Sequence, residues 1–128
     1  MTIVLDSWAV LCLLGDEGPG AERVEQVLPQ RPVMSWVNLG EVLYILHRRH
    51  GPAAAADAVR DLVATLVAEL PTEAVVRQAA AVKAAHAMSY ADAFAAATAL
   101  AHSAELWTGD PELLVPRAPW RPIDLRSP

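Results

Sequence analysis

The chain has 128 residues, a net charge of −5 and a hydrophobic fraction of 54%, much of it alanine. This length corresponds most simply to one domain, residues 1–128, that can bury a real core. The negative charge argues against a protein that grips nucleic acid through its overall charge, because counterion release needs clustered Lys and Arg. A local basic patch remains compatible with it.

Cys12 is the single cysteine, so the chain can form neither an intrachain disulfide nor a cysteine zinc site. It lies in an apolar stretch and is expected to be a buried small residue. No basic residue precedes the first apolar run, and Asp6 interrupts that run, which argues against a secretory signal. No apolar stretch approaches the roughly 20 residues that span a bilayer. We therefore expect a cytoplasmic protein.

Apolar runs of two kinds alternate along the chain. Short, β-branched runs predict buried strands, and longer stretches with apolar residues three and four apart predict helices. In chain order we expect a strand at 2–6, helices at 7–14 and 21–28, a strand at 33–36, helices at 38–50 and 52–67, a strand at 68–70, helices at 73–86 and 89–103, and strands at 105–108 and 122–125. The alternation predicts an α/β fold with a mostly parallel central sheet covered on both faces.

Four carboxylates fall where a predicted strand gives way to a helix, or just inside that helix: Asp6, Glu41, Asp92 and Asp110. The carboxyl ends of parallel strands form the edge where such folds bind ligands. Four negative charges at one edge repel each other unless a cation or protons intervene. Because the set offers only oxygen ligands, it suits Mg²⁺ or Mn²⁺ far better than zinc.

Each carboxylate also has a capping interpretation. Asp92 with Ser89, and Glu41 with Asn38, stand at the spacing of capping boxes. Asp6 or the following Ser7 could cap the first helix, and Asp110 could cap the turn at Pro111. The capping interpretation is weaker for the four together, because it requires independent caps to gather at one edge by coincidence.

Other hydrolytic chemistries fit the sequence poorly. Phosphatases that attack phosphate with an aspartate carry a second aspartate two residues later, and here that position is Trp8. No Gly-x-Ser-x-Gly elbow and no phosphate-cradling glycine-rich loop is present. Metal-assisted hydrolysis is therefore the leading chemistry.

The segment 47–50, His-Arg-Arg-His, is the densest positive patch. With Lys83 and His86 it is the best candidate for contacts with a phosphate backbone. The alternative is that it ends a helix, where cations complement the helix dipole.

Four blocks of sequence carry a family resemblance: Val4-Leu5-Asp6-Ser7, Ser35 followed six residues later by Glu41-Val42, the run from Ser89 to Ala97, and Thr108-Gly109-Asp110-Pro111-Glu112-Leu113. In this order and spacing the chain resembles the PIN-domain ribonucleases, most closely the VapC toxins of bacterial toxin–antitoxin pairs. The resemblance spans nearly the whole chain.

The resemblance implies a PIN-like α/β/α sandwich, an Mg²⁺- or Mn²⁺-dependent endoribonuclease, a homodimer and a cognate antitoxin. The family's acidic quartet falls on Asp6, Glu41, Asp92 and Asp110. Asp6, Asp92 and Asp110 would hold metal, and Glu41 would ligate through water or orient the nucleophile for in-line attack on an RNA phosphodiester. Thr108 would support Asp110, and Glu112 is a candidate accessory carboxylate. The alternative function is a catalytically silent PIN-like binding module.

The chain departs from the family pattern at two positions. Trp8 stands where members often have a small polar residue, and Asn38 where they often have threonine. The first departure removes a polar group that could support Asp6. Asn38 still offers a side chain that can form hydrogen bonds.

Overall fold

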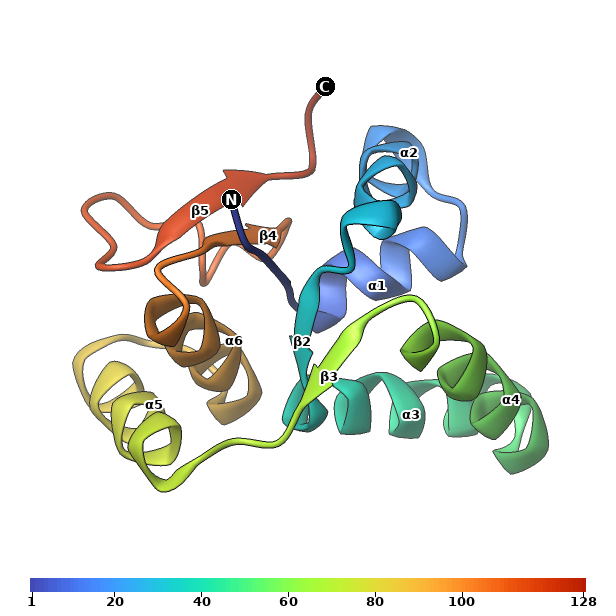
Figure 1. Cartoon of the computed structure of the whole chain (residues 1–128), viewed down its shortest axis with the longest axis horizontal. Coiled ribbons are helices and arrows are strands. Elements are labelled where there is room, and N and C mark those ends of the chain that lie inside the picture. Colours follow the sequence, from blue (N-terminus) through green and yellow to red (C-terminus); the bar gives the residue numbers. More distant parts are fainter.

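The computed structural model describes residues 1–128 as one parallel sheet enclosed between two groups of helices (Figure 1). The strand order is β3-β2-β1-β4-β5, and every neighbouring pair is parallel. The predicted α/β sandwich is confirmed, and the sheet is parallel throughout. The elements are β1 Ile3–Leu5, α1 Ser7–Leu14, α2 Gly18–Val27, the 3-10 turn η1 Leu28–Gln30, β2 Val33–Ser35, α3 Trp36–His50, α4 Pro52–Val63, β3 Val67–Glu69, α5 Glu73–Ala85, α6 Tyr90–Ala101, β4 Glu105–Thr108 and β5 Arg121–Asp124.

Several predicted boundaries were wrong by a few residues. The helix expected at 52–67 ends at Val63, and the next strand begins at Val67. The helix expected from residue 38 begins at Trp36, because the Ser35 hydroxyl caps it by accepting the Val37 N–H at 3.2 Å. Gly51 separates α3 from α4 with a φ of 88°, a conformation that costs a glycine little. Most of these differences arise at helix ends, which hydropathy alone does not define.

The sheet has a separate hydrophobic core on each face. On one face Val4, Val33 and Leu106 pack with α5 and α6. On the other face Ile3, Leu5 and Met34 pack with the helices α1 to α4. Figure 1 shows these two helix groups on opposite sides of the strands. Because both faces of the sheet are buried, the strands are mostly continuous apolar runs and do not alternate apolar with polar residues.

Helix α6 lies against the sheet along almost its whole length. Its central residues Ala95, Ala96 and Ala97 have no exposed surface. Alanine lets the helix backbone approach the strands and α5 closely, and the one buried hydroxyl, on Thr98, donates to the Phe94 carbonyl at 2.7 Å. The alanine bias of the chain therefore serves close packing of the helix that carries Asp92.

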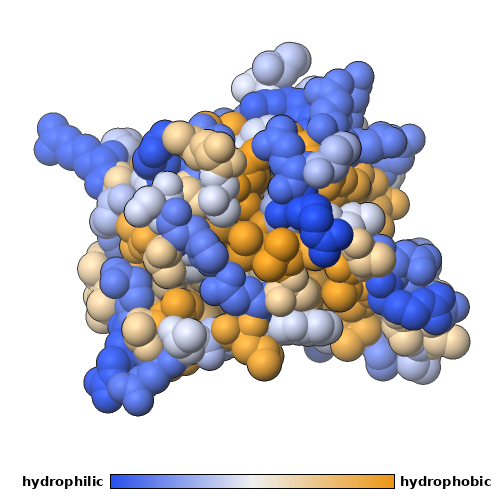
Figure 2. All heavy atoms as spheres, in the orientation of Figure 1, coloured by the Kyte–Doolittle hydropathy of each residue, from blue (hydrophilic) through white to orange (hydrophobic).

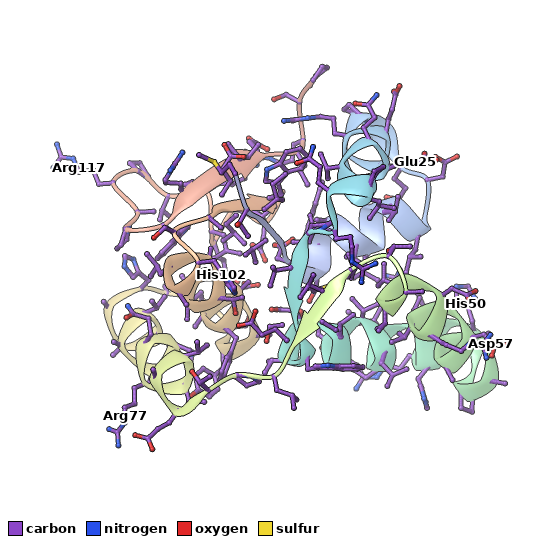
Figure 3. The ribbon with its side chains drawn as sticks, viewed as in Figure 1. Glu25, His50, Asp57, Arg77, His102 and Arg117 are labelled. Atoms are coloured by element: carbon purple, nitrogen blue, oxygen red, sulfur yellow. The ribbon has the colours of Figure 1, made fainter.

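Charged and polar residues dominate the outer surface. Figure 2 shows them around the rim of one face, with apolar atoms near its middle and at its lower edge. In Figure 3 the labelled side chains Asp57, Arg77 and Arg117 project outward, away from the strands. None of the helices combines the length and the apolar character required to cross a membrane.

Close packing of α6 predicts that a larger side chain at Ala96 is poorly tolerated. We expect Ala96→Leu to lower the free energy of unfolding by about 1 to 3 kcal/mol, because the added methyl groups must displace packed neighbours. Ala101→Leu, at an exposed position on the same helix, should change it by less than about 0.5 kcal/mol. Urea denaturation of both variants measures the difference, and equal stabilities would contradict the packing described for α6.

Candidate active site

The four predicted carboxylates come from elements that meet at the carboxyl edge of the sheet. Asp6 directly follows β1, and Asp110 lies two residues after β4. Asp92 occupies the first turn of α6, and Glu41 lies in α3, which begins where β2 ends. Parallel strands separated by helices place all these segments at one edge, as their positions in the sequence predicted.

Asp6 is almost completely buried, with 1% of its surface exposed. Its Oδ1 accepts the Ala9 N–H at 2.8 Å, and its Oδ2 accepts the Thr108 hydroxyl. Asp6 is therefore the cap of α1, and the suggestion that Ser7 caps it is wrong. The Ser7 hydroxyl instead donates to the Asn38 carbonyl at 3.1 Å and ties α1 to α3.

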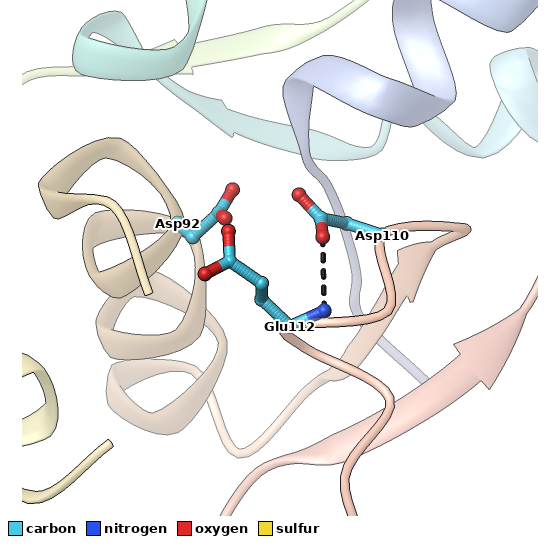
Figure 4. Close-up of side chains that lie close together, drawn as sticks. All are labelled: Asp92, Asp110 and Glu112. Atoms are coloured by element: carbon cyan, nitrogen blue, oxygen red, sulfur yellow. Dashed lines mark hydrogen bonds between the residues drawn. The ribbon is translucent and has the colours of Figure 1, made fainter. Parts of the chain in front are cut away.

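Thr108 links two of the aspartates. While its hydroxyl donates to Asp6, it accepts the backbone N–H of Asp110 at 2.9 Å. Asp110 Oδ1 in turn accepts the N–H of Glu112 at 2.9 Å, the interaction drawn in Figure 4. The turn after β4 is thus held by side chains within the acidic site itself.

Asp92, Asp110 and Glu112 form the closest group of carboxylates. One oxygen from each lies within 4.8 Å of the others, and Figure 4 shows the three side chains converging from α6 and from the turn after β4. Glu112, a candidate accessory residue in the sequence, is thereby brought into the centre. Asp6 and Glu41 lie outside this group of three. The charge of Asp6 acts on Asp92, and the charge of Glu41 acts on Asp6.

The capping-box interpretation fails for Glu41 and holds in part for Asp92. Asn38 lies inside α3 rather than at its start, and is fully buried. Its amide donates to the Ala91 carbonyl at 3.0 Å and so joins α3 to the first turn of α6, while its Oδ1 is buried without a hydrogen-bond donor. Ser89 does cap α6, since its hydroxyl accepts the Asp92 N–H at 3.1 Å.

Burial and mutual repulsion raise the proton affinity of two of these groups. The pKa of Asp6 is raised to about 7, first by burial and then by the charges of Asp110 and Glu41, while hydrogen bonds from Thr108 and Ala9 oppose the rise. The pKa of Asp92 is likewise raised, first by burial and then by the charge of Asp110 and a hydrogen bond shared with it. Two carboxyl groups in contact favour one shared proton.

The raised pKa values provide a test of whether a cation fits the centre. Burial and the charge of Asp110 disfavour the ionised form of Asp92 and so raise its pKa, which means that this carboxylate lacks a compensating positive charge. A divalent cation would supply that charge, and the all-oxygen donor set matches a hard ion. Asp92, Asp110 and Glu112 therefore fit a hard divalent cation.

The basic patch expected from the sequence is not assembled. Figure 3 places His50 at the end of α3, on the opposite side of the molecule from α5, which carries Lys83. Lys83 donates to the Met88 carbonyl at 2.7 Å, and the His86 ring stands edge-on to Trp120 with centroids 5.1 Å apart. Lys83 and His86 therefore do not join the cluster at 47–50, and contact with a phosphate backbone stays a prediction.

The family model described as the PIN domain matches residues 3–117. The chain therefore belongs to the PIN domain family. A comparison with curated proteins found no match.

Solved structures of similar fold come from several bacteria. VapBC of Salmonella typhimurium, bound to DNA, matches with a TM-score of 0.79 at 16% identity, over 98% of both chains. VapBC-1 of nontypeable Haemophilus influenzae matches with a TM-score of 0.76 at 22% identity, again over 98% of both. VapC20 of Mycobacterium tuberculosis, a toxin that cleaves the sarcin–ricin loop, matches with a TM-score of 0.71 at 24% identity, over 86% of this chain and 91% of that one. At these identities the likeness establishes a common fold.

The electrostatics of the site predict a pH dependence of stability in the absence of divalent cations. The pKa of Asp6 is near 3.8 in an unfolded chain and about 7 in the folded protein. The folded state therefore binds the proton more tightly, and stability falls as pH rises between these values. The fall should amount to a few kcal/mol, because a tenfold difference in proton affinity corresponds to about 1.4 kcal/mol.

Thermal unfolding in a chelator across this pH range measures the effect. Asp92→Asn, which removes one of the repelling charges, should melt above the wild type near neutral pH. Added Mn²⁺ should raise the melting temperature of the wild type more than that of the variant. A wild type whose stability rises with pH through this window would show that the carboxylates are not strained by burial and repulsion.

Proposed function

We propose that this protein is an endoribonuclease that requires Mg²⁺ or Mn²⁺ and acts as the toxin of a toxin–antitoxin pair. The observation that carries the proposal is the convergence of Asp92, Asp110 and Glu112, with ligand oxygens within 4.8 Å of one another, at the carboxyl edge of a PIN fold. The structural likeness to VapC and VapBC proteins supports the biological setting.

The residues of the centre take different roles. Asp92 and Asp110 hold the ion, and Glu112 provides a third carboxylate. Asp6 adds negative charge beside them, and through the Thr108 hydroxyl it fixes the turn that carries Asp110. Glu41, half-exposed on α3, would orient the attacking water. When bound, the ion would polarise the scissile phosphate and favour ionisation of water.

The proposal includes an antitoxin and a second copy of the chain as partners. Several large apolar side chains are exposed, among them Leu70 at 73%, Tyr44 at 47%, Tyr90 at 44% and Trp36 at 40%. Side chains of this size favour burial against another protein surface. Tyr44 lies outside the buried stripe of α3, with the Arg48 guanidinium 5.1 Å from the centre of its ring.

RNA cleavage by purified protein freed of any partner tests the activity directly. We expect cleavage of single-stranded RNA only with added Mg²⁺ or Mn²⁺. Asp92→Asn should reduce the rate by more than about a hundredfold, since mutating even the outer partners of metal ligands usually costs roughly 10- to 100-fold in affinity or activity.

Asp57→Asn provides the matched control, because Asp57 is an exposed aspartate on α4 whose partner is the exposed Arg60. The control should cleave as the wild type does. Cleavage by Asp92→Asn at the wild-type rate would refute the metal role of that residue. A folded wild type that binds RNA without cleaving it under any metal condition would instead favour the silent binding module.

The assembly is tested by light scattering. We expect a homodimer at high micromolar concentration, or a complex when the antitoxin is co-expressed, because association covers exposed apolar side chains. Tyr44→Ser and Leu70→Ser identify which exposed residue contributes to the interface. A wild type that remains monomeric at this concentration and forms no complex with an antitoxin would contradict this part of the proposal.

A further inference from the structure

The ring of Trp8 occupies the space beside Gly109. A Cβ atom built on Gly109 would lie 2.3 Å from Trp8 Cζ2, 2.4 Å from Cη2 and 2.5 Å from Cε2. These separations are far shorter than any van der Waals contact. The six-membered part of the indole therefore packs directly on the backbone of this glycine, and no side chain fits between them.

The need for glycine at position 109 comes from this contact and not from backbone conformation. Gly18 and Gly51 are the glycines with positive φ, so the backbone of Gly109 is one that alanine could adopt. Gly40 also lacks a positive φ, but it has free space around it, because nothing lies within 4 Å of a Cβ built there. The two glycines thus form a matched pair, one blocked by a ring and one open.

The contact lies next to residues of the acidic site. Gly109 is buried between Thr108, whose hydroxyl joins Asp6 to the Asp110 backbone, and Asp110 itself. Trp8 stands two residues after Asp6 in the first turn of α1. Figure 4 shows the start of α1 beside the turn that carries Asp110. The ring therefore packs against the turn from Thr108 to Asp110, in which the Thr108 hydroxyl bonds to both Asp6 and the Asp110 backbone.

We propose that Trp8 is a positioning residue for the metal centre. Its ring fixes the Thr108–Asp110 turn so that the Thr108 hydroxyl reaches Asp6 while the Asp110 carboxylate faces Asp92 and Glu112. Trp8 itself touches neither metal nor substrate in this role. The inference rests on the proposed function, because the centre that Trp8 positions is the proposed metal site.

A double-mutant cycle on Trp8 and Gly109 tests this, with Mn²⁺ affinity measured by calorimetry as the readout. Gly109→Ala should weaken Mn²⁺ binding by about tenfold or more, because the new methyl group must displace either the ring or the turn. Trp8→Leu alone should also weaken Mn²⁺ binding, because the turn then lacks the ring that fixes it. Adding Gly109→Ala to Trp8→Leu should cause little further loss, because the new methyl group no longer meets a ring. The double variant should then bind Mn²⁺ within about threefold of Trp8→Leu alone.

Gly40→Ala serves as the matched control and should bind Mn²⁺ as the wild type does. Circular dichroism confirms that each variant is folded under the titration conditions. If Gly109→Ala does not fold, the double variant decides the matter, since relief of the clash should allow it to fold and bind.

Three results would overturn the inference. One is a folded Gly109→Ala variant with wild-type Mn²⁺ affinity, and another is a folded Trp8→Leu variant with wild-type Mn²⁺ affinity. In both cases the proposed function survives, because the wild type still binds the ion. A wild type that binds no Mn²⁺ would refute the proposed function and this inference together.

Discussion

Repulsion between carboxylates gathered at one edge of a parallel sheet is the constraint on which the rest of this structure depends. Asp6 is 1% exposed, and its charge meets those of Asp110 and Glu41. Burial and the nearby Asp110 carboxylate raise the pKa of Asp92. Groups that repel in this way stay together only if the surrounding fold prevents their separation. Both hydrophobic cores, and the close packing of α6, provide that restraint.

Helix capping and membership of the acidic site proved to be compatible roles. Asp6 Oδ1 caps α1, and the same side chain belongs to the group of interacting carboxylates. Helices that follow parallel strands begin at the carboxyl edge, where their amino ends favour negative charge. A residue that caps such a helix therefore necessarily lies at the edge where the acidic site forms. The two interpretations that the sequence left open for Asp6 describe one arrangement.

Polar support of Asp6 comes from the far end of the chain. Position 8, where the family often has a small polar residue, is a tryptophan in this protein and packs against Gly109. The hydroxyl that reaches Asp6 belongs to Thr108, at the end of the neighbouring strand β4. Because the same hydroxyl accepts the Asp110 N–H, a single threonine holds two strand ends in register. Trp8 therefore supplies packing against Gly109 instead of a polar group, and Asp6 keeps a hydrogen bond from Thr108.

The sequence by itself determined the alternation of strands and helices, the parallel sheet and the edge at which Asp6, Asp92 and Asp110 lie. These features depend on local hydrophobic patterns and on the geometry common to all βαβ units, so neighbouring residues suffice to predict them. Only the tertiary structure decided that Glu112 joins Asp92 and that Asn38 bonds to Ala91, and only the packed fold separates Lys83 from the cluster at 47–50. Those outcomes depend on distances between side chains that are remote in sequence. The packing of whole helices sets these distances, and no pattern of residues along the chain encodes them.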